Sequence, residues 1–281
     1  MAKEKVVVAL GGGGSKGSFH LGALDYILEK FDIEGIVGTS IGAMNAYFIA
    51  ANKMAELKKI WLDKNIQDNI LTPWQFGLVE GFIKGSLYKP DGIRKAISSL
   101  KVEEVLKTGI QYGCVSTDMI NQKKVFTKLT ESNKNEIIDW ITASSAISPA
   151  FGPVRINGGV YMDGGYSEGI PVESATSLIK EAKRVIMIAC DKSGTDTDNP
   201  VVWKDGLINV FMQATSTCID TIFDYNVKYG QLKYWSKIKD IRFDFIYPET
   251  QVLSSAFDFN QSKLMENIRL GFTTASSVLE K

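Results

Sequence analysis

The chain has 281 residues, of which 44% are hydrophobic, and its 32 lysines and arginines balance 32 aspartates and glutamates. This length and apolar content suffice for one large α/β domain, and the zero formal net charge gives no general attraction to nucleic acid. We therefore expect a single domain over residues 1–281 and no nucleic-acid partner.

The first sixty residues have the pattern of a βαβ unit. An apolar run at 6–10 predicts a buried strand, a run of glycines follows, and residues 18–30 carry the apolar stripe of a helix. A strand at 33–37 then leads through Gly38-Thr-Ser-Ile-Gly42 into a helix predicted over 43–57. Strands joined by one helix are normally parallel, so both glycine turns should lie at the carboxyl edge of one sheet.

The middle of the chain begins with an aromatic stretch at 66–88, for which buried packing competes with a lid or a lipid-facing surface. A short helix starting at Asp91 follows it. The pattern then predicts strands at 111–116 and 123–127 and a helix at 134–145.

Residues 154–163 form a predicted hairpin, because Asn157-Gly158 between alternating residues is typical of a type I′ turn. The later elements are a strand at 184–190, a polar loop at 191–200, a mainly helical part that is either core or acyl-chain pocket, a strand at 241–247 and a helix at 260–279. We expect a three-layer α/β/α sandwich with a mainly parallel sheet, in which the C-terminal part, about 200–281, packs on the part that carries the motifs, about 5–190.

The two glycine turns carry the strongest chemical signal. Gly38-Thr-Ser-Ile-Gly42 has the G-x-S-x-G form of a nucleophile elbow, in which glycines flank a serine on a sharp turn from strand to helix. Ser40 is therefore a candidate nucleophile. The earlier run around Gly12, Gly13 and Gly14 exposes backbone N–H groups that can approach an anion closely, as an oxyanion hole requires.

The single histidine of the chain limits the choice of general base. His20 is predicted about 9 Å along the first helix from the glycine run, where a structural role is favoured over proton transfer. A Ser-Asp-His order with a C-terminal histidine is excluded. The base is then a carboxylate, a lysine or water.

The glycine run, the elbow and Asp163-Gly-Gly165 together resemble the patatin-like phospholipase family, and the serine- and proline-containing segment at 143–153 is similar to that family as well. The resemblance implies that Ser40 is the nucleophile, that Asp163 completes a Ser-Asp dyad, and that the glycine run forms the oxyanion hole. Lys16 stands where the family often has a basic residue, so it is a candidate for electrostatic support. Gly169 stands where the family commonly has asparagine.

The resemblance implies a lipid acyl-ester hydrolase of the phospholipase A or lysophospholipase type, which uses no metal and no cofactor. One alternative is a lipid-binding module that keeps the fold but has little turnover. A second is a dinucleotide-binding protein, because Gly12-x-Gly14-x-x-Gly17 with Asp32 also fits that fingerprint. The fingerprint's acid belongs at the end of the second strand, however, and Asp32 falls at its beginning.

The three cysteines, Cys114, Cys190 and Cys218, have no metal-ligand spacing and are predicted to be buried, reduced thiols. The N-terminal apolar run is too short for a signal peptide, and no run is long enough to span a bilayer. We therefore expect a cytoplasmic protein with peripheral contact to membranes and a lipid or fatty-acyl ester as substrate. The oligomeric state is left open.

Overall fold

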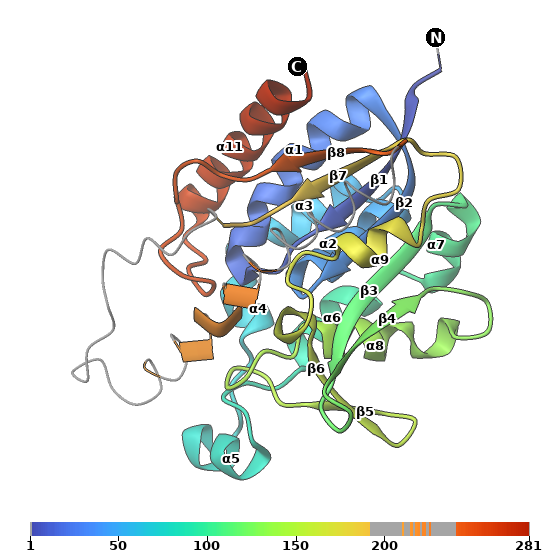
Figure 1. Cartoon of the computed structure of the whole chain (residues 1–281). Coiled ribbons are helices and arrows are strands. Elements are labelled where there is room, and N and C mark those ends of the chain that lie inside the picture. Colours follow the sequence, from blue (N-terminus) through green and yellow to red (C-terminus); the bar gives the residue numbers. More distant parts are fainter. Residues whose placement is uncertain are drawn as a thin grey trace.

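The computed structural model describes residues 2–191 and 240–280, with a few further positions between 210 and 225. Within them lies an eight-stranded sheet of order β5-β6-β3-β2-β1-β7-β8, in which β4 also pairs with β3 (Figure 1). The strands are β1 (Glu4–Leu10), β2 (Phe31–Thr39), β3 (Gln111–Asp118), β4 (Lys123–Lys128), β5 (Val154–Ile156), β6 (Gly159–Asp163), β7 (Arg184–Ile188) and β8 (Arg242–Ile246). The five strands from β3 to β8 along this order are parallel, and β4, β5 and β6 add antiparallel pairs.

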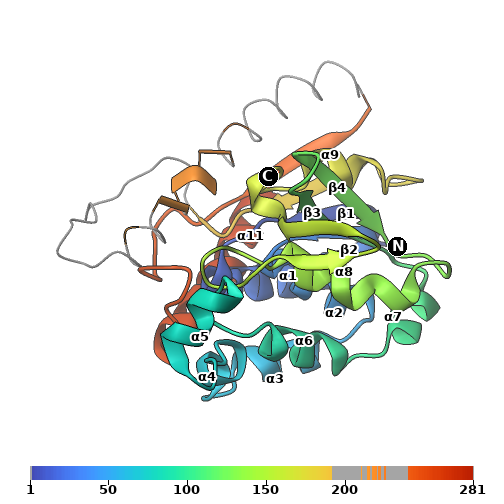
Figure 2. The same cartoon turned by 90° about the horizontal axis from the view of Figure 1, so that it is seen from below.

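Helices cover both faces of the sheet. Figure 2 shows α1, α2 and α8 along one face and α9 on the other. The described helices are α1 (Ser18–Lys30), α2 (Ile41–Ala50), α3 (Met54–Trp61), α4 (Ile66–Ile70), α5 (Gly77–Lys84), α6 (Asp91–Ser98), α7 (Val102–Thr108), α8 (Ile137–Ser144), α9 (Val172–Thr176) and α11 (Gln261–Leu279). Short 3-10 turns are η1 (Gly14–Gly17), η2 (Lys134–Glu136) and η3 (Gly164–Tyr166).

The central strand shows why the sheet is buried on both sides. Side chains alternate along a strand, so Val6 and Val8 of β1 enter the core beneath α1 and α2, whereas Val7 and Ala9 enter the core beneath α9. All four residues are fully buried. A continuous apolar strand between two helical layers is what a mainly parallel sheet requires. The predicted three-layer α/β fold is confirmed.

Most predicted elements appear close to their expected positions, including the hairpin, in which Asn157 and Gly158 both have positive φ angles of 49° and 81°. The single helix predicted over 43–57 is wrong. The chain breaks it between α2 and α3, where Asn52 adopts a left-handed conformation with φ 59° that asparagine tolerates well. Helix α7 was not predicted.

Part of the prediction falls on positions that the structure does not describe. The polar loop predicted at 191–200 lies outside the described residues except for Asp191, and most of the helical part predicted after it does as well. Cys114 and Cys190 are buried free thiols, but Cys218 is exposed, so the prediction that it is buried is wrong. Across the described residues, no helix combines the length and the hydropathy needed to cross a bilayer.

Candidate active site

The position of the site follows from how β2 and β6 meet along one edge of β3. Strand β4 occupies the other edge, where it pairs with β3 from Gly113 to Asp118. The last residue of β2, Thr39, pairs with Val115, and the last residue of β6 pairs with the next residue of β3. Because β2 is parallel and β6 antiparallel to β3, their carboxyl ends point toward each other. The residues at these ends, Ser40 and Asp163, therefore lie together although they are far apart in sequence.

Ser40 occupies the turn from β2 into α2 in a strained conformation. Its backbone angles are φ 56° and ψ −126°, a combination that costs a non-glycine residue about 1–3 kcal/mol. The glycines on either side make the turn sterically feasible. A Cβ on Gly38 would lie 2.1 Å from the carbonyl carbon of Gly42, and one on Gly42 would lie 2.4 Å from the carbonyl oxygen of Leu10. The geometry is that of a nucleophile elbow.

Two serines at the end of α8 hold the backbone of Ser40. The Ser40 N–H donates to Ser144 Oγ at 3.0 Å, and Ser145 Oγ donates to the Ser40 carbonyl at 3.2 Å. The Ser144 hydroxyl in turn donates to the carbonyl of Val115 on β3. These contacts fix the strained turn to the sheet. Sequence reasoning did not assign this role to either serine, and its only signal was the serine pair within the segment at 143–153.

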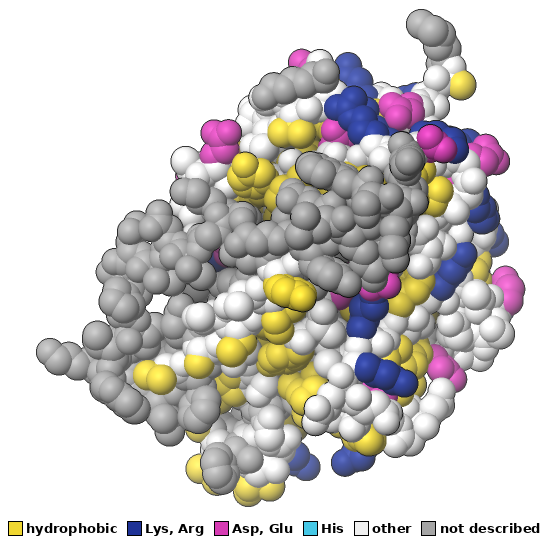
Figure 3. Space-filling view, in the orientation of Figure 1, with side chains coloured by type: hydrophobic (Ala, Val, Ile, Leu, Met, Phe, Trp, Pro, Cys, Tyr) yellow, Lys and Arg dark blue, Asp and Glu magenta, His cyan; other side chains and the backbone are white. Residues whose placement is uncertain are grey.

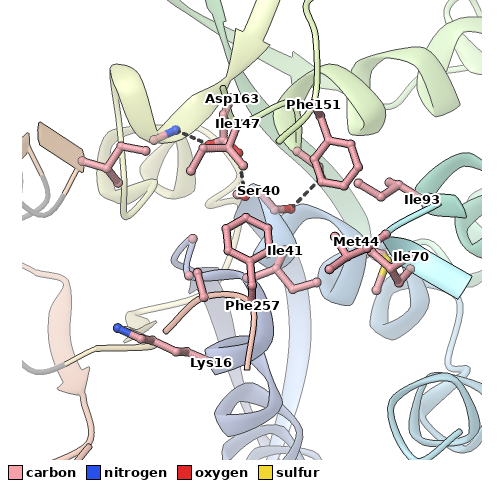
Figure 4. Close-up of a pocket in the computed structure, with 18 of the residues that line it drawn as sticks. Lys16, Ser40, Ile41, Met44, Ile70, Ile93, Ile147, Phe151, Asp163 and Phe257 are labelled. Carbon is pink, nitrogen blue, oxygen red and sulfur yellow. Dashed lines mark hydrogen bonds between the residues drawn. The ribbon is translucent and has the colours of Figure 1, made fainter. Parts of the chain in front are cut away.

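The side chain of Ser40 is hydrogen bonded to a buried carboxylate (Figure 4). Its Oγ donates to Asp163 Oδ2 at 2.7 Å, and the Gly165 N–H donates to Asp163 Oδ1 at 2.8 Å. Asp163 is only 1% exposed. Burial raises the pKa of Asp163 to about 7, although the two hydrogen bonds favour the charged form and act in the opposite direction. A carboxylate in this state can accept a proton near neutral pH.

The glycine run passes directly beside Ser40. Gly12 lies so close that a Cβ on it would be 3.3 Å from Ser40 Cβ. Its own N–H, however, donates to the carbonyl of Gly169 at 3.0 Å and is not available to a ligand. In the described part of the chain the N–H groups of Gly13 and Gly14 have no backbone acceptor. Among the described residues, two of the three expected donors therefore have no backbone partner, and the third, the Gly12 N–H, is bonded to the carbonyl of Gly169.

An apolar cavity of about 130 Å³ opens at Ser40 and Asp163. Its walls come mainly from helices α2, α4 and α6, from the loop between α8 and β5, and from the segment before α11, as Figure 4 shows for the labelled side chains. The apolar lining residues include Ile41, Met44, Ile66, Ile70, Leu71, Ile93, Ile147, Phe151, Phe257 and Phe259. An apolar lining of this kind complements a hydrocarbon chain better than a sugar or a nucleotide.

Comparison with known proteins assigns the family. A family model described as Patatin-like phospholipase matches residues 8–176 of the chain. The chain belongs to the patatin-like phospholipase family. The match covers the glycine run, the elbow and Asp163, so the resemblance noted in the sequence is confirmed.

Curated relatives are similar to the chain over about three quarters of its length. An uncharacterized NTE family protein of Mycobacterium tuberculosis is 26% identical over 221 residues, which are 78% of this chain and 59% of the relative. A protein of Debaryomyces hansenii named lysophospholipase NTE1 is 29% identical over 217 residues, 74% of this chain and 13% of the relative. The chain thus spans 59% and 13% of the lengths of these curated relatives.

A solved structure supports the patatin-like fold. VipD from Legionella pneumophila aligns with a TM-score of 0.50 at 12% sequence identity, and the alignment covers 100% of this chain and 67% of VipD. At this identity the likeness concerns the fold alone.

Of two further candidates from the sequence, Lys16 lies in the lining of the cavity and His20 is buried outside that lining. Lys16 lines the cavity, but its amino group forms an ion pair with Asp191, so its charge is already partly compensated. His20 is fully buried, with its ring nitrogens 3.2 Å from Asn45 Nδ2 and 3.0 Å from Cys190 Sγ. Burial lowers the pKa of His20 to about 3, which keeps the ring neutral. These contacts give His20 a structural role.

The position of Asp32 argues against the dinucleotide-binding alternative. Asp32 pairs in register with Lys5 at the start of β1, whereas the glycine run follows the end of that strand. The acid and the glycines are therefore at opposite edges of the sheet. A ribose bound beside Gly12 is out of reach of Asp32.

Proposed function

We propose that the protein hydrolyses lipid acyl esters, with Ser40 as nucleophile and Asp163 as general base and acid. The observation that carries the proposal is the hydrogen bond from Ser40 Oγ to the buried carboxylate of Asp163, 2.7 Å long, at the wall of an apolar cavity. A nucleophile within hydrogen-bond reach of an oriented base is the expected arrangement for covalent catalysis. The Gly165 N–H orients that base through its second oxygen.

The reaction has two steps. Ser40 Oγ attacks the ester carbonyl while its proton passes to Asp163 Oδ2, and the tetrahedral intermediate then expels the alcohol, which takes that proton. Water next attacks the acyl-enzyme, gives a proton to Asp163 and releases the fatty acid. The proton finally returns to Ser40 Oγ, so the enzyme is regenerated.

The negative charge that develops on the carbonyl oxygen needs donors beside Ser40. In the proposal these are the N–H groups of Gly13 and Gly14, with Gly12 holding the loop in place through its bond to Gly169. The N-terminus of α2 begins at Ile41, and its positive end adds to the field at this point. Lys16 contributes through its long-range charge, reduced by its pairing with Asp191.

The substrate class follows from the cavity and the family. An apolar lining accommodates an acyl chain and excludes water, which strengthens every electrostatic interaction at the reacting centre. The Debaryomyces hansenii relative is named a lysophospholipase, and the family model is named for phospholipases. We therefore propose phospholipase A or lysophospholipase activity for this chain.

A fluorophosphonate probe tests the nucleophile directly. We expect the wild-type protein to be labelled and the Ser40→Ala variant to remain unlabelled. Ser145→Ala serves as a matched control that keeps every reacting group. Because it removes only one bond to the Ser40 backbone, it should still be labelled. If the wild type is neither labelled nor active on phospholipids and lysophospholipids, the proposal fails and a lipid-binding role without turnover is favoured.

A further inference from the structure

Helix α5 presents an apolar face to solvent. Phe76, just before the helix, is 74% exposed, and on the helix Leu78, Val79 and Ile83 are 63%, 71% and 76% exposed. At about 100° per residue the three helical positions fall within about 140° of the circumference, so they share one face. A helix on the surface of a globular protein normally turns its apolar face toward the core. The apolar face of α5 points away from the core, which indicates that it contacts an apolar partner.

The segment that carries α5 is closed at its base and attached beside the cavity. Pro73 and Tyr88 form a β-bridge, and the Lys89 N–H donates to the Thr72 carbonyl at 2.8 Å. The N–H groups of Leu87 and Tyr88 donate to the carbonyls of Pro149 and Ala150 at 2.8 and 2.9 Å. This attachment fixes how α5 projects from the molecule, as Figure 1 shows at its lower end.

The same attachment connects the apolar face of α5 with the cavity. The next residue after Ala150 is Phe151, which lines the cavity, and Ile70 and Leu71 at the other end of the segment line it as well. The segment that carries α5 is therefore attached next to residues that form the wall of the cavity that holds Ser40.

The base of the segment has the composition of a lipid–water interface. The Lys89 amino group lies 5.7 Å from the centre of the Trp74 ring, and the Trp74 indole N–H donates to the Ser86 carbonyl at 2.9 Å. Lys84 ends α5 and is exposed. An aromatic ring and basic side chains next to exposed apolar side chains are typical of a segment at a lipid–water interface. Figure 3 shows hydrophobic side chains at this lower end, with lysine or arginine beside them.

We propose that α5 inserts into the surface of a phospholipid bilayer that contains anionic lipid and brings the cavity to that surface. A second protein is the weaker occupant, because one face of an eight-residue helix is far smaller than the roughly 800 Å² per partner of a stable interface. Insertion needs no complementary shape, and Lys84 and Lys89 complement anionic headgroups. Binding to vesicles is independent of catalysis, whereas delivery of substrate to Ser40 depends on the proposed function.

The test compares binding to vesicles of phosphatidylcholine and phosphatidylglycerol by flotation. We expect Phe76→Ser with Ile83→Ser to lower the partition coefficient about 100-fold, at roughly tenfold per side chain. Leu78→Ser with Val79→Ser provides a second, independent variant. Met265→Ser, in which an apolar side chain that is 44% exposed on α11 is removed, is the matched control and should bind as the wild type does. Lys84→Gln should weaken binding about fivefold, and only to anionic vesicles.

Hydrolysis of a soluble butyrate ester separates this proposal from the previous one. The α5 variants should keep the wild-type rate on this ester and lose activity on vesicles in proportion to binding. Vesicle binding of Ser40→Ala should equal that of the wild type even if no hydrolysis is found. The proposal is overturned if wild-type protein does not float with vesicles or if both α5 variants float as it does. It is equally overturned if the α5 substitutions convert a dimer to a monomer without changing vesicle binding, because the face is then an interface between copies.

Discussion

In the proposed mechanism, the pH dependence of ester hydrolysis follows from the environment of Asp163. This side chain is 1% exposed, and burial raises its pKa to about 7. Only the carboxylate can take the proton from Ser40, so the rate should rise with pH and level off above pH 7. The relevant quantity is kcat/KM, because it reports ionisation of the free enzyme.

The size of the effect is large enough to measure. One pH unit below the pKa about a tenth of the carboxylate remains, so kcat/KM should be about a tenth of its plateau at pH 6 and about a hundredth at pH 5. An exposed aspartate with the ordinary pKa of 3.8 would give an almost constant rate over this range. The two possibilities therefore differ by about two orders of magnitude at pH 5.

The assay uses the soluble butyrate ester at constant ionic strength, with butyrate measured after quenching so that detection does not depend on pH. Asp163→Asn should lower the plateau about 10²–10⁴-fold and remove the inflection near pH 7. Glu168→Gln is the matched control. Glu168 is another buried carboxyl with a raised pKa, but it accepts hydrogen bonds from the Glu173 N–H and Ser174 Oγ and forms an ion pair with Lys124. A profile that is flat from pH 5 to 9, or one that loses its inflection in Glu168→Gln, would refute the reasoning.

Three further predictions concern stability and positioning. The folded pKa of Asp163 lies above its ordinary value of 3.8, so native protein binds this proton more tightly, and the contribution of Asp163 to the free energy of unfolding falls as pH rises from 4 to 7. Asp163→Asn should therefore gain stability relative to the wild type over that window, on the order of 4 kcal/mol, in denaturant titrations at pH 4 and 8. Ser144→Ala leaves the Ser40 N–H without its acceptor and should cost about 1–3 kcal/mol and lower kcat, measured by denaturation and butyrate release. Asn260→Ala removes the N-cap of α11 and should cost about 1 kcal/mol without changing kcat.

Local patterns predicted the parts of this fold in which sequence and surroundings agree. Strand β1 is an unbroken apolar run because it is buried on both faces, and helix α1 begins and ends at the residues that its apolar stripe predicts. The hairpin turn at Asn157 was readable because few residues adopt positive φ as readily as asparagine and glycine. The break at Asn52 carried the same signal, but the alanine-rich sequence before it favoured a continuous helix.

Other features depend on contacts between distant segments and had no local signal. The end-to-end meeting of β2 and β6 follows from pairing with β3, which no periodicity reveals. The bond from the Gly12 N–H to Gly169 removes one expected oxyanion donor, yet a run of glycines gives no indication of which amide is already used. The exposed face of α5 has the same composition as a buried one, so the sequence at 66–88 left packing and lipid contact open.

Burial explains how a dyad could work in a chain whose single histidine is confined to the core. An imidazole has an ordinary pKa near 6.5, and desolvation brings the carboxyl of Asp163 to about 7, so the surroundings give an aspartate the basicity that a histidine has in water. The same burial makes the charged form costly to the fold. A bound acyl chain would exclude more water and raise the pKa of Asp163 further, so kcat should show its inflection at a higher pH than kcat/KM. A kcat inflection at the same or a lower pH would mean that the substrate does not desolvate the carboxyl.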